Sequence, residues 1–230
     1  MTLPLYPATP EWDAAWSLAT ADQFIQRKTD RARRMREHEE YVSAWLLHAF
    51  RQPRGLVIDV GPGCGELLEL ARHAGHEVLG VDAPDGAGGM GDAYLRACRL
   101  MHQRQKLPVV YERFLDWIAD DLMVLIGRCV AINFRGSWEQ TLSDMMAGMP
   151  HDRHHDAKRL AWRETPQTVD AVCVVMRRLS ELLRPGGVVC IHCNGAQNHA
   201  WMSGVMDDAA QAAGLRFHAS DGDRLKAWVR

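Results

Sequence analysis

The chain has 230 residues, 24% of them charged, and a formal net charge of −2. A charge this close to zero excludes a surface-wide field that attracts nucleic acid. No stretch approaches the ~20 apolar residues that a membrane span requires. The six cysteines lie mostly within apolar patterns, which favours reduced, buried thiols over a disulfide framework, and the first residues do not resemble a secretory signal. We therefore expect a cytoplasmic globular protein.

Residues 1–54 differ in character from the rest and are expected to form an N-terminal helical extension. Prolines keep the start extended, and apolar residues then recur at helical spacing from Glu11 onward. A second helix, about Thr29 to Phe50, begins in a basic stretch between Lys28 and Arg36. We favour a solvated helix face for that stretch over a contact with nucleic acid or phosphate.

The segment Gly55 to Asp82 carries the strongest pattern in the chain. It predicts a buried strand, a tight glycine turn, a helix and a second buried strand that ends on the Asp82 carboxylate. Glycines at alternate positions of the turn permit a sharp reversal and a close approach of the backbone to a ligand. The spacing G-x-G-x-G differs from the G-x-G-x-x-G of dinucleotide-binding folds, and the next position holds the charged Glu66.

Alternating helices and strands follow this unit. The pattern predicts a helix over 93–105, a strand over 109–111, a helix or turn over 114–119, and a fourth strand over 129–133, with the apolar run 122–126 as a competitor. An amphipathic helix over 168–183, a strand after Pro185-Gly-Gly, a helix over 198–213 and a hairpin over 214–229 complete the chain. Elements in this order predict an α/β fold with a mainly parallel sheet and helices on both faces.

Two separated motifs resemble class I S-adenosylmethionine-dependent methyltransferases: the glycine turn with Asp82, and the segment Leu182-Leu-Arg-Pro-Gly-Gly before a buried strand. The resemblance covers residues 55–230, which we treat as one cofactor-binding domain. It implies a Rossmann-like, seven-stranded sheet closed by a C-terminal antiparallel hairpin, with N-terminal helices placed over the site as a lid. It also implies that S-adenosyl-L-methionine is the cofactor.

The resemblance further implies a set of cofactor-binding residues along the carboxyl ends of the strands. The glycine turn would receive the methionyl part, and Asp82 would hold the ribose. An acidic residue after the third strand often lies near the adenine in this family, and both Glu112 and Asp116 are candidates here. The complete set of expected cofactor-binding residues is Asp59, Gly61, Pro62, Gly63, Cys64, Gly65, Asp82, Ala83, Phe114, Asp116 and Asn133.

The residues after the fourth and fifth strands are candidates for the substrate site, since ligands of open α/β sheets bind beyond the carboxyl ends of the strands. Asn133-Phe lacks the Pro-Pro of nucleotide-methylating relatives, which disfavours amino-methylation of adenine or glutamine. Arg135 and Glu139 could orient a polar acceptor, although a helix-capping loop explains them equally well. Tyr41 and Asn194 complete the expected substrate-binding residues.

Histidines supply the candidate general base. His151, His154 and His155 lie in one polar loop, which is a solvated loop, a source of the base, or a metal site; we expect no metal there, because related metal sites use carboxylate and amide oxygens. His192, at the end of the fifth strand, is the fourth candidate.

The leading hypothesis is therefore a methyltransferase that acts on a small molecule by in-line displacement. The alternatives are methylation of RNA or protein, an NAD(P)-dependent oxidoreductase, and a non-catalytic partner subunit. Nucleic acid and membranes are not expected as partners, and the sequence leaves the oligomeric state open, with a homodimer among the options.

Overall fold

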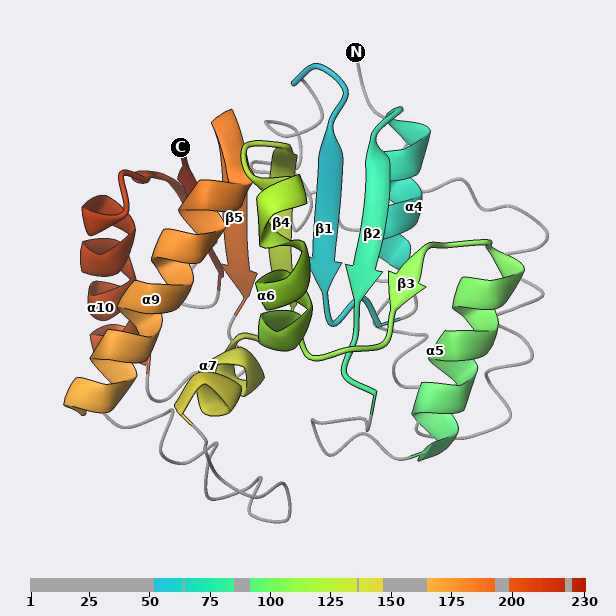
Figure 1. The fold of residues 1–230 in the computed structure, drawn as a ribbon, viewed down its shortest axis with the longest axis horizontal. Coiled ribbons are helices and arrows are strands. Elements are labelled where there is room, and N and C mark those ends of the chain that lie inside the picture. The colour runs from blue at the N-terminus through green and yellow to red at the C-terminus, as the bar shows by residue number, and fades with distance from the viewer. Residues whose placement is uncertain are drawn as a thin grey trace.

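A computed structural model of the chain describes residues 52–63, 65–84, 92–135, 137–146, 165–192, 199–221 and 225–230. The described residues form one seven-stranded sheet in the order β3-β2-β1-β4-β5-β7-β6, with helices packed against it (Figure 1). The strands are β1 (Leu56–Val60), β2 (Glu77–Val81), β3 (Val109–Val110), β4 (Cys129–Arg135), β5 (Leu183–His192), β6 (Arg216–Asp221) and β7 (Leu225–Val229). The helices are α4 (Glu66–His73), α5 (Asp92–Arg104), α6 (Phe114–Leu125), α7 (Trp138–Met146), α9 (Pro166–Leu182) and α10 (His199–Ala212).

The predicted fold class is confirmed for the described residues. Strands β1 to β5 pair in parallel, and β7 pairs antiparallel with both β5 and β6. The all-parallel order of a dinucleotide-binding fold is 3-2-1-4-5-6, so the antiparallel β7 inserted beside β5 distinguishes this sheet. Apart from residues 52–54, the predicted N-terminal helical extension lies outside the described residues.

Both faces of the sheet are covered, because neighbouring residues of each buried strand point to opposite sides. On one side, Ile58 and Ile132 belong to the larger core cluster, which includes apolar residues of α6, α7, α9 and α10. On the other side, Val57 and Ala131 belong to a second cluster with residues of α4. Every residue of β1 is buried, as the uninterrupted apolar run of the sequence predicted.

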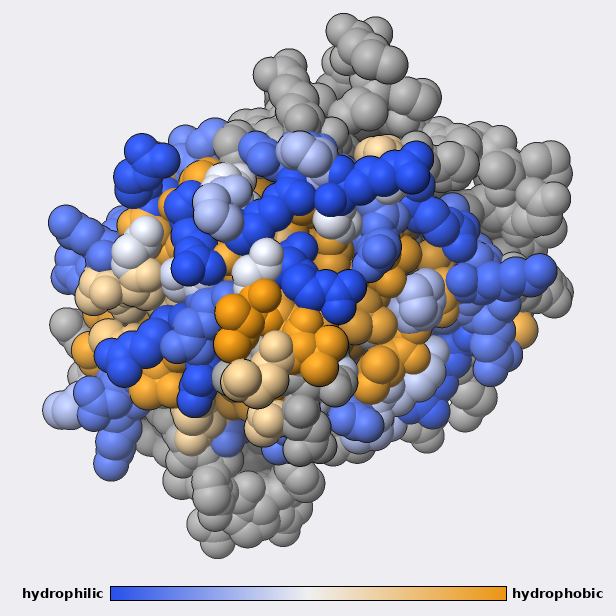
Figure 2. Space-filling view, turned by 45° about the horizontal axis from the view of Figure 1, so that its top comes forward, coloured by the Kyte–Doolittle hydropathy of each residue, from blue (hydrophilic) through white to orange (hydrophobic). Residues whose placement is uncertain are grey.

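The predicted fourth strand over 129–133 is confirmed as part of β4, and the alternative over 122–126 was wrong, because residues 122–125 are the last part of α6. Met123 is 82% exposed and Val124 64% exposed, whereas Leu125 is buried in the core. An apolar run therefore lies here on the outside of a helix, which periodicity alone does not distinguish from a short strand. The end of α6 lies toward the top of Figure 1, and Figure 2 turns this side toward the viewer. The surface there has hydrophobic areas bordered by hydrophilic side chains.

The fifth strand begins earlier than the sequence indicated. We expected Pro185-Gly-Gly to form a turn before the strand, but β5 starts at Leu183, directly after α9. The register with β4 jumps from Cys129↔Leu183 to Ala131↔Val188, so the Pro-Gly-Gly segment bulges out of an otherwise continuous strand. Gly186, with φ 78°, also donates its backbone N–H to the carbonyl of Arg230, which ties the bulge to the end of the chain.

Within the described part of the chain, no helix is long and apolar enough to cross a membrane. Among the described residues, Cys98, Cys129 and Cys190 are buried, Cys173 is partly buried, and none of the four forms a disulfide. Cys64 and Cys193 lie outside the described residues.

Replacing Gly65 by Ala is expected to destabilise the fold by about 2–4 kcal/mol, because φ is +87° and an added Cβ would lie 2.3 Å from Cδ1 of Leu107. Gly127→Ala is the matched control: φ is +68° but no atom lies within 4 Å, so only the backbone strain of about 1–2 kcal/mol applies. Urea unfolding measures both variants. Equal losses would show that Leu107 does not restrict this turn.

Candidate functional site

The candidate site lies at the carboxyl ends of the parallel strands, at the bottom of the sheet in Figure 1. The strand order reverses between β1 and β4: the chain passes from β1 outward to β2 and β3, then returns to β4 on the other side of β1. Ligands of open α/β sheets bind at this kind of switch point, because the connections on either side of it diverge and leave a crevice.

The glycine turn between β1 and α4 has the backbone geometry that the sequence predicted. Gly61, Gly63 and Gly65 have φ values of 72°, 60° and 87°, a region that other residues rarely adopt. The N–H of Gly61 donates to the carbonyl of Val81 at 2.8 Å, and that of Gly65 donates to the carbonyl of Pro62 at 3.0 Å. The turn is therefore fixed to the end of β2 and leads directly into the first turn of α4.

Asp82 follows β2 and stands beside this turn, as predicted. Its backbone N–H donates to the carbonyl of Val110 at 2.9 Å, which holds the residue between β2 and β3. Burial raises the pKa of the Asp82 carboxyl from 3.8 to about 6, although a hydrogen bond from the backbone of Ala83 and the charge of Arg99 act in the opposite direction. A partly buried carboxylate with this pKa favours a ligand that donates hydrogen bonds to it.

Asp59 and Asn133 form a buried pair across β1 and β4. They are register partners, and Nδ2 of Asn133 donates to Oδ1 of Asp59 at 2.6 Å. Only 1% of Asp59 and 5% of Asn133 is exposed. Ser137, after β4, donates its hydroxyl to the carbonyl of Val60, so the same two strand ends are joined a second time. The structure thus brings together two residues that the sequence placed separately.

The other predicted site residues at this edge are mostly buried. Phe114 begins α6 and packs edge-to-face against Phe134, with 5.2 Å between the ring centroids. Glu139, in the first turn of α7, and His192, at the end of β5, are each 5% exposed. His192 is the register partner of Arg135, the last residue of β4.

The structure does not choose between the two acidic candidates for the adenine. Glu112 and Asp116 are both exposed, and they lie before and within the first turn of α6. Six predicted residues lie outside the described residues: Tyr41, Cys64, His151, His154, His155 and Asn194. Among the residues that the structure does describe, no group of three histidine, cysteine or acidic side chains is placed to hold a metal ion.

Three residues around the glycine turn were not predicted from the sequence: Arg99 and His102 on α5, and Tyr111 after β3. His102 is 2% exposed, and its ring nitrogens lie 2.9 Å from the carbonyl oxygen of Gly63 and 3.0 Å from the hydroxyl of Tyr111. The only signal was a histidine next to Met101 on the apolar face of the predicted helix. Such a position does not reveal which distant backbone group the imidazole contacts.

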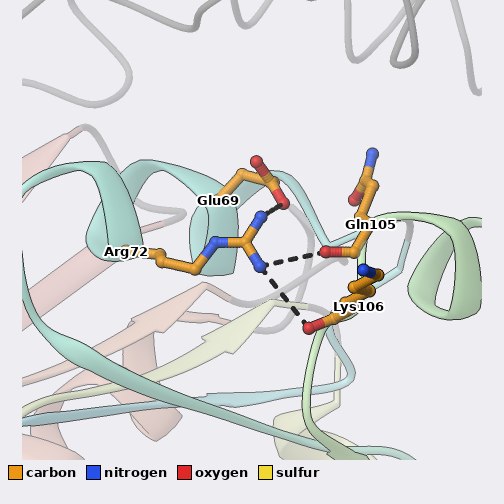
Figure 3. Close-up of polar contacts among 4 residues, drawn as sticks. All are labelled: Glu69, Arg72, Gln105 and Lys106. Atoms are coloured by element: carbon orange, nitrogen blue, oxygen red, sulfur yellow. Dashed lines mark hydrogen bonds and ion pairs between the residues drawn. The ribbon is translucent and has the colours of Figure 1, made fainter.

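A second contact holds the end of α5 against α4 (Figure 3). Arg72 donates to the carbonyl oxygens of Gln105 at 2.9 Å and Lys106 at 3.4 Å, and it forms an ion pair with Glu69. Both residues follow α5, in the turn that leads to β3. The guanidinium therefore fixes this turn beside the glycine turn.

No protein-family model and no curated protein matches the chain. Solved structures with some likeness to it include the antibiotic-resistance methyltransferase Kmr, at 18% identity and TM-score 0.42 over 80% of this chain and 90% of that one. Another is a TehB-like SAM-dependent methyltransferase from Corynebacterium glutamicum ATCC 13032 Kitasato, at 15% identity and TM-score 0.44 over 89% and 98%. A third is precorrin-6y C5,15-methyltransferase from Geobacter metallireducens GS-15, at 11% identity and TM-score 0.48 over 80% and 84%. Likeness at this level assigns no function to this chain.

Replacing Asn133 by Ala is expected to destabilise the protein by about 1–3 kcal/mol, because the Asp59 carboxylate loses a buried donor. A double-mutant cycle with Asp59→Ala, measured by urea unfolding, should give a coupling free energy above about 0.5 kcal/mol. Strictly additive effects would mean that the 2.6 Å contact contributes nothing to stability.

Proposed function

We propose that the chain is an S-adenosylmethionine-dependent methyltransferase that transfers a methyl group to a small-molecule acceptor. The observation that carries this proposal is the pairing of the glycine turn with Asp82 at the switch point of the sheet. The glycines of the turn leave its backbone uncovered by side chains, and the Asp82 carboxylate stands at the end of the neighbouring strand β2. Backbone N–H groups and one carboxylate suit a ligand with a ribose diol and an amino-acid tail.

The residues present fit this cofactor. Asp82 accepts a hydrogen bond from Ala83, and a carboxylate has further acceptor capacity for the two hydroxyl groups of a ribose. The raised pKa of Asp82 shows that its charge is poorly solvated in the protein alone, so donors from a ligand would stabilise the ionised form. Asp59 and Asn133 lie near the carboxyl ends of the adjacent strands β1 and β4, which flank the switch point of the sheet.

A dinucleotide fits less well. The glycine spacing places Glu66, the first residue of α4, where a pyrophosphate would face the helix N-terminus, and like charges repel there. The antiparallel β7 also departs from the all-parallel order of dinucleotide-binding sheets. Both features favour the methyltransferase over an NAD(P)-dependent oxidoreductase.

The chain would contribute positioning and proton removal to the reaction. When bound, S-adenosylmethionine supplies an electrophilic methyl group, whose bond to sulfur breaks as an acceptor lone pair binds the carbon, leaving S-adenosylhomocysteine. The protein has to hold the acceptor atom about 3–3.5 Å from that carbon, in line with the breaking bond. Arg135, the last residue of β4, and Glu139, in the first turn of α7, are proposed to orient the acceptor together with Tyr41 and Asn194.

A general base is needed when the acceptor atom still carries a proton that it loses on methylation. His192, at the carboxyl end of β5, and the loop histidines His151, His154 and His155 are the proposed sources. The formal net charge of −2 supports a small acceptor over RNA, because it offers no general attraction to phosphates. The positions of most cysteines within apolar patterns of the sequence support a cytoplasmic protein.

Replacing Asp82 by Ala is expected to weaken binding of S-adenosylhomocysteine roughly 10–150-fold, because charge-assisted hydrogen bonds to the ribose are lost. Isothermal calorimetry measures the affinity. Asp170→Ala, which removes an exposed carboxylate on α9, is the control and should bind like the unaltered protein. Binding of NADH in place of S-adenosylhomocysteine would contradict the proposed function.

The affinity for S-adenosylhomocysteine should fall as the pH is lowered through about 6, the pKa of Asp82 in the protein alone. The ribose hydroxyls donate hydrogen bonds to the carboxylate of Asp82, so the cofactor binds better to the ionised side chain. The ionised side chain predominates above this pH, and affinity is therefore lost below it. Calorimetry between about pH 5 and pH 8 tests this, and Asp82→Asn should remove the dependence. A pH-independent affinity in the unaltered protein would exclude Asp82 from the ribose contact.

A further inference from the structure

The last turn of α5 and the residues that follow it lie directly against the glycine turn. An added Cβ on Gly65 would lie 2.3 Å from Cδ1 of Leu107 and 3.4 Å from Cδ2 of His102, so the two segments are in tight contact. Arg72, on α4, holds the residues that directly follow α5 (Figure 3). The position of α5 is therefore linked to the backbone of the turn.

His102 makes the polar contact between the two segments. Its Nε2 lies 2.9 Å from the carbonyl oxygen of Gly63, and a carbonyl oxygen only accepts hydrogen bonds, so Nε2 carries the proton. In a neutral imidazole, Nδ1 is then an acceptor, and the hydroxyl of Tyr111 donates to it at 3.0 Å. Both contacts together define one tautomer.

The surroundings keep this histidine neutral. Burial is the main cause that lowers the pKa of His102 from 6.5 to about 4; the hydrogen bond with Gly63 opposes this shift, and the nearby charge of Arg99 adds to it. Tyr111 keeps its proton, because burial raises the pKa of the phenol and the charge of Asp82 acts in the same direction. Arg99, from α5, and Asp82, after β2, are the charged groups that act on the pair.

Arg99 extends the same contacts to the segment after β2. Its guanidinium carbon lies 4.8 Å from the centre of the Tyr111 ring, and its Nη2 donates to the carbonyl of Pro84 at 2.7 Å. Residues of α5 thus contact the backbone after β1 and after β2, and the side chain after β3. These are the segments that border the proposed cofactor crevice on one side of the switch point.

We propose that His102 is a positioning residue for cofactor binding, which fixes the direction of the Gly63 carbonyl through Nε2–H while the Tyr111 hydroxyl fixes its tautomer. This inference rests on the proposed function, because it assigns the glycine turn to the cofactor. His102 needs no contact with the cofactor: it acts through the peptide group of the turn. If the turn samples several orientations, the cofactor binds only those molecules in which the turn has the right one. The apparent affinity for the cofactor then falls in proportion to that fraction.

Three variants separate this role from mere packing. His102→Leu removes both hydrogen bonds and should weaken binding of S-adenosylhomocysteine about tenfold, as measured by calorimetry well below the unfolding temperature. Tyr111→Phe removes only the donor to Nδ1 and should weaken binding by a smaller factor. His102→Gln keeps an amide N–H that can reach Gly63, so part of the affinity should return. His218→Leu, on β6 at the opposite edge of the sheet, is the control and should leave affinity unchanged.

A spectroscopic measurement tests the geometry without any cofactor. Nitrogen-15 NMR should show His102 as the neutral Nε2–H tautomer, with no titration between about pH 5.5 and pH 8, whereas an ordinary histidine titrates near 6.5. Tyr111→Phe should change the Nδ1 signal, because its donor is lost.

The outcomes are distinguishable. If the unaltered protein does not bind S-adenosylhomocysteine, the proposed function fails and the positioning role fails with it. If it binds and His102→Leu binds equally well, or if NMR shows the Nδ1–H tautomer, the positioning role alone is overturned. Should His102→Leu not fold, Tyr111→Phe and His102→Gln still decide the matter, since unchanged affinity in both would also refute it.

Discussion

The left-handed backbone of the glycine turn is the constraint on which the rest of the site depends. Three residues with positive φ between positions 61 and 65 reverse the chain within a few residues, so that α4 runs back against β1 and β2. Because these residues lack side chains, Leu107 and His102 of the neighbouring segment can pack directly against the turn. The close approach brings an imidazole within hydrogen-bonding distance of Gly63 and leaves the Asp82 carboxylate beside the same turn. A bulkier turn would separate these groups.

Two carboxylates near this turn differ in what surrounds them. Asp59 lies on the central strand β1, between β2 and β4, where it is 1% exposed and receives a hydrogen bond from Asn133. Asp82 follows β2 near the outer strand β3, and burial without sufficient compensation raises its pKa to about 6. The first carboxylate therefore joins two strands, whereas the second is suited to receive donors from a ligand. Their positions in the sheet, and not their residue type, separate the two roles.

The sequence predicted the fold well wherever a local pattern reports the environment of a residue. Buried runs such as Leu56–Val60 became central strands, and the stripe along Pro166–Leu182 became the buried face of a helix. Where the same pattern is compatible with two environments, the sequence left an alternative open or misplaced a boundary: the apolar run after Asp121, the alternative to the fourth strand, ends α6, and Pro185-Gly-Gly bulges within β5. In the candidate site, Asp82 and the glycines were found because backbone conformation and charge appear in the sequence itself. The helical extension and the histidine loop remain predictions, outside the described residues.

By itself, the sequence determined the glycine turn, the carboxylate after the second strand and the alternation that builds a parallel sheet, because each depends on residues close together in the chain. Only the tertiary structure decided that Asn133 pairs with Asp59 and that His102 contacts Gly63, since those partners are 74 and 39 positions apart in the sequence. The sheet order brings β4 beside β1, and the end of α5 packs against the glycine turn. Hydrogen bonds of this kind form where packing leaves a donor and an acceptor at the right distance, and no local pattern encodes that distance.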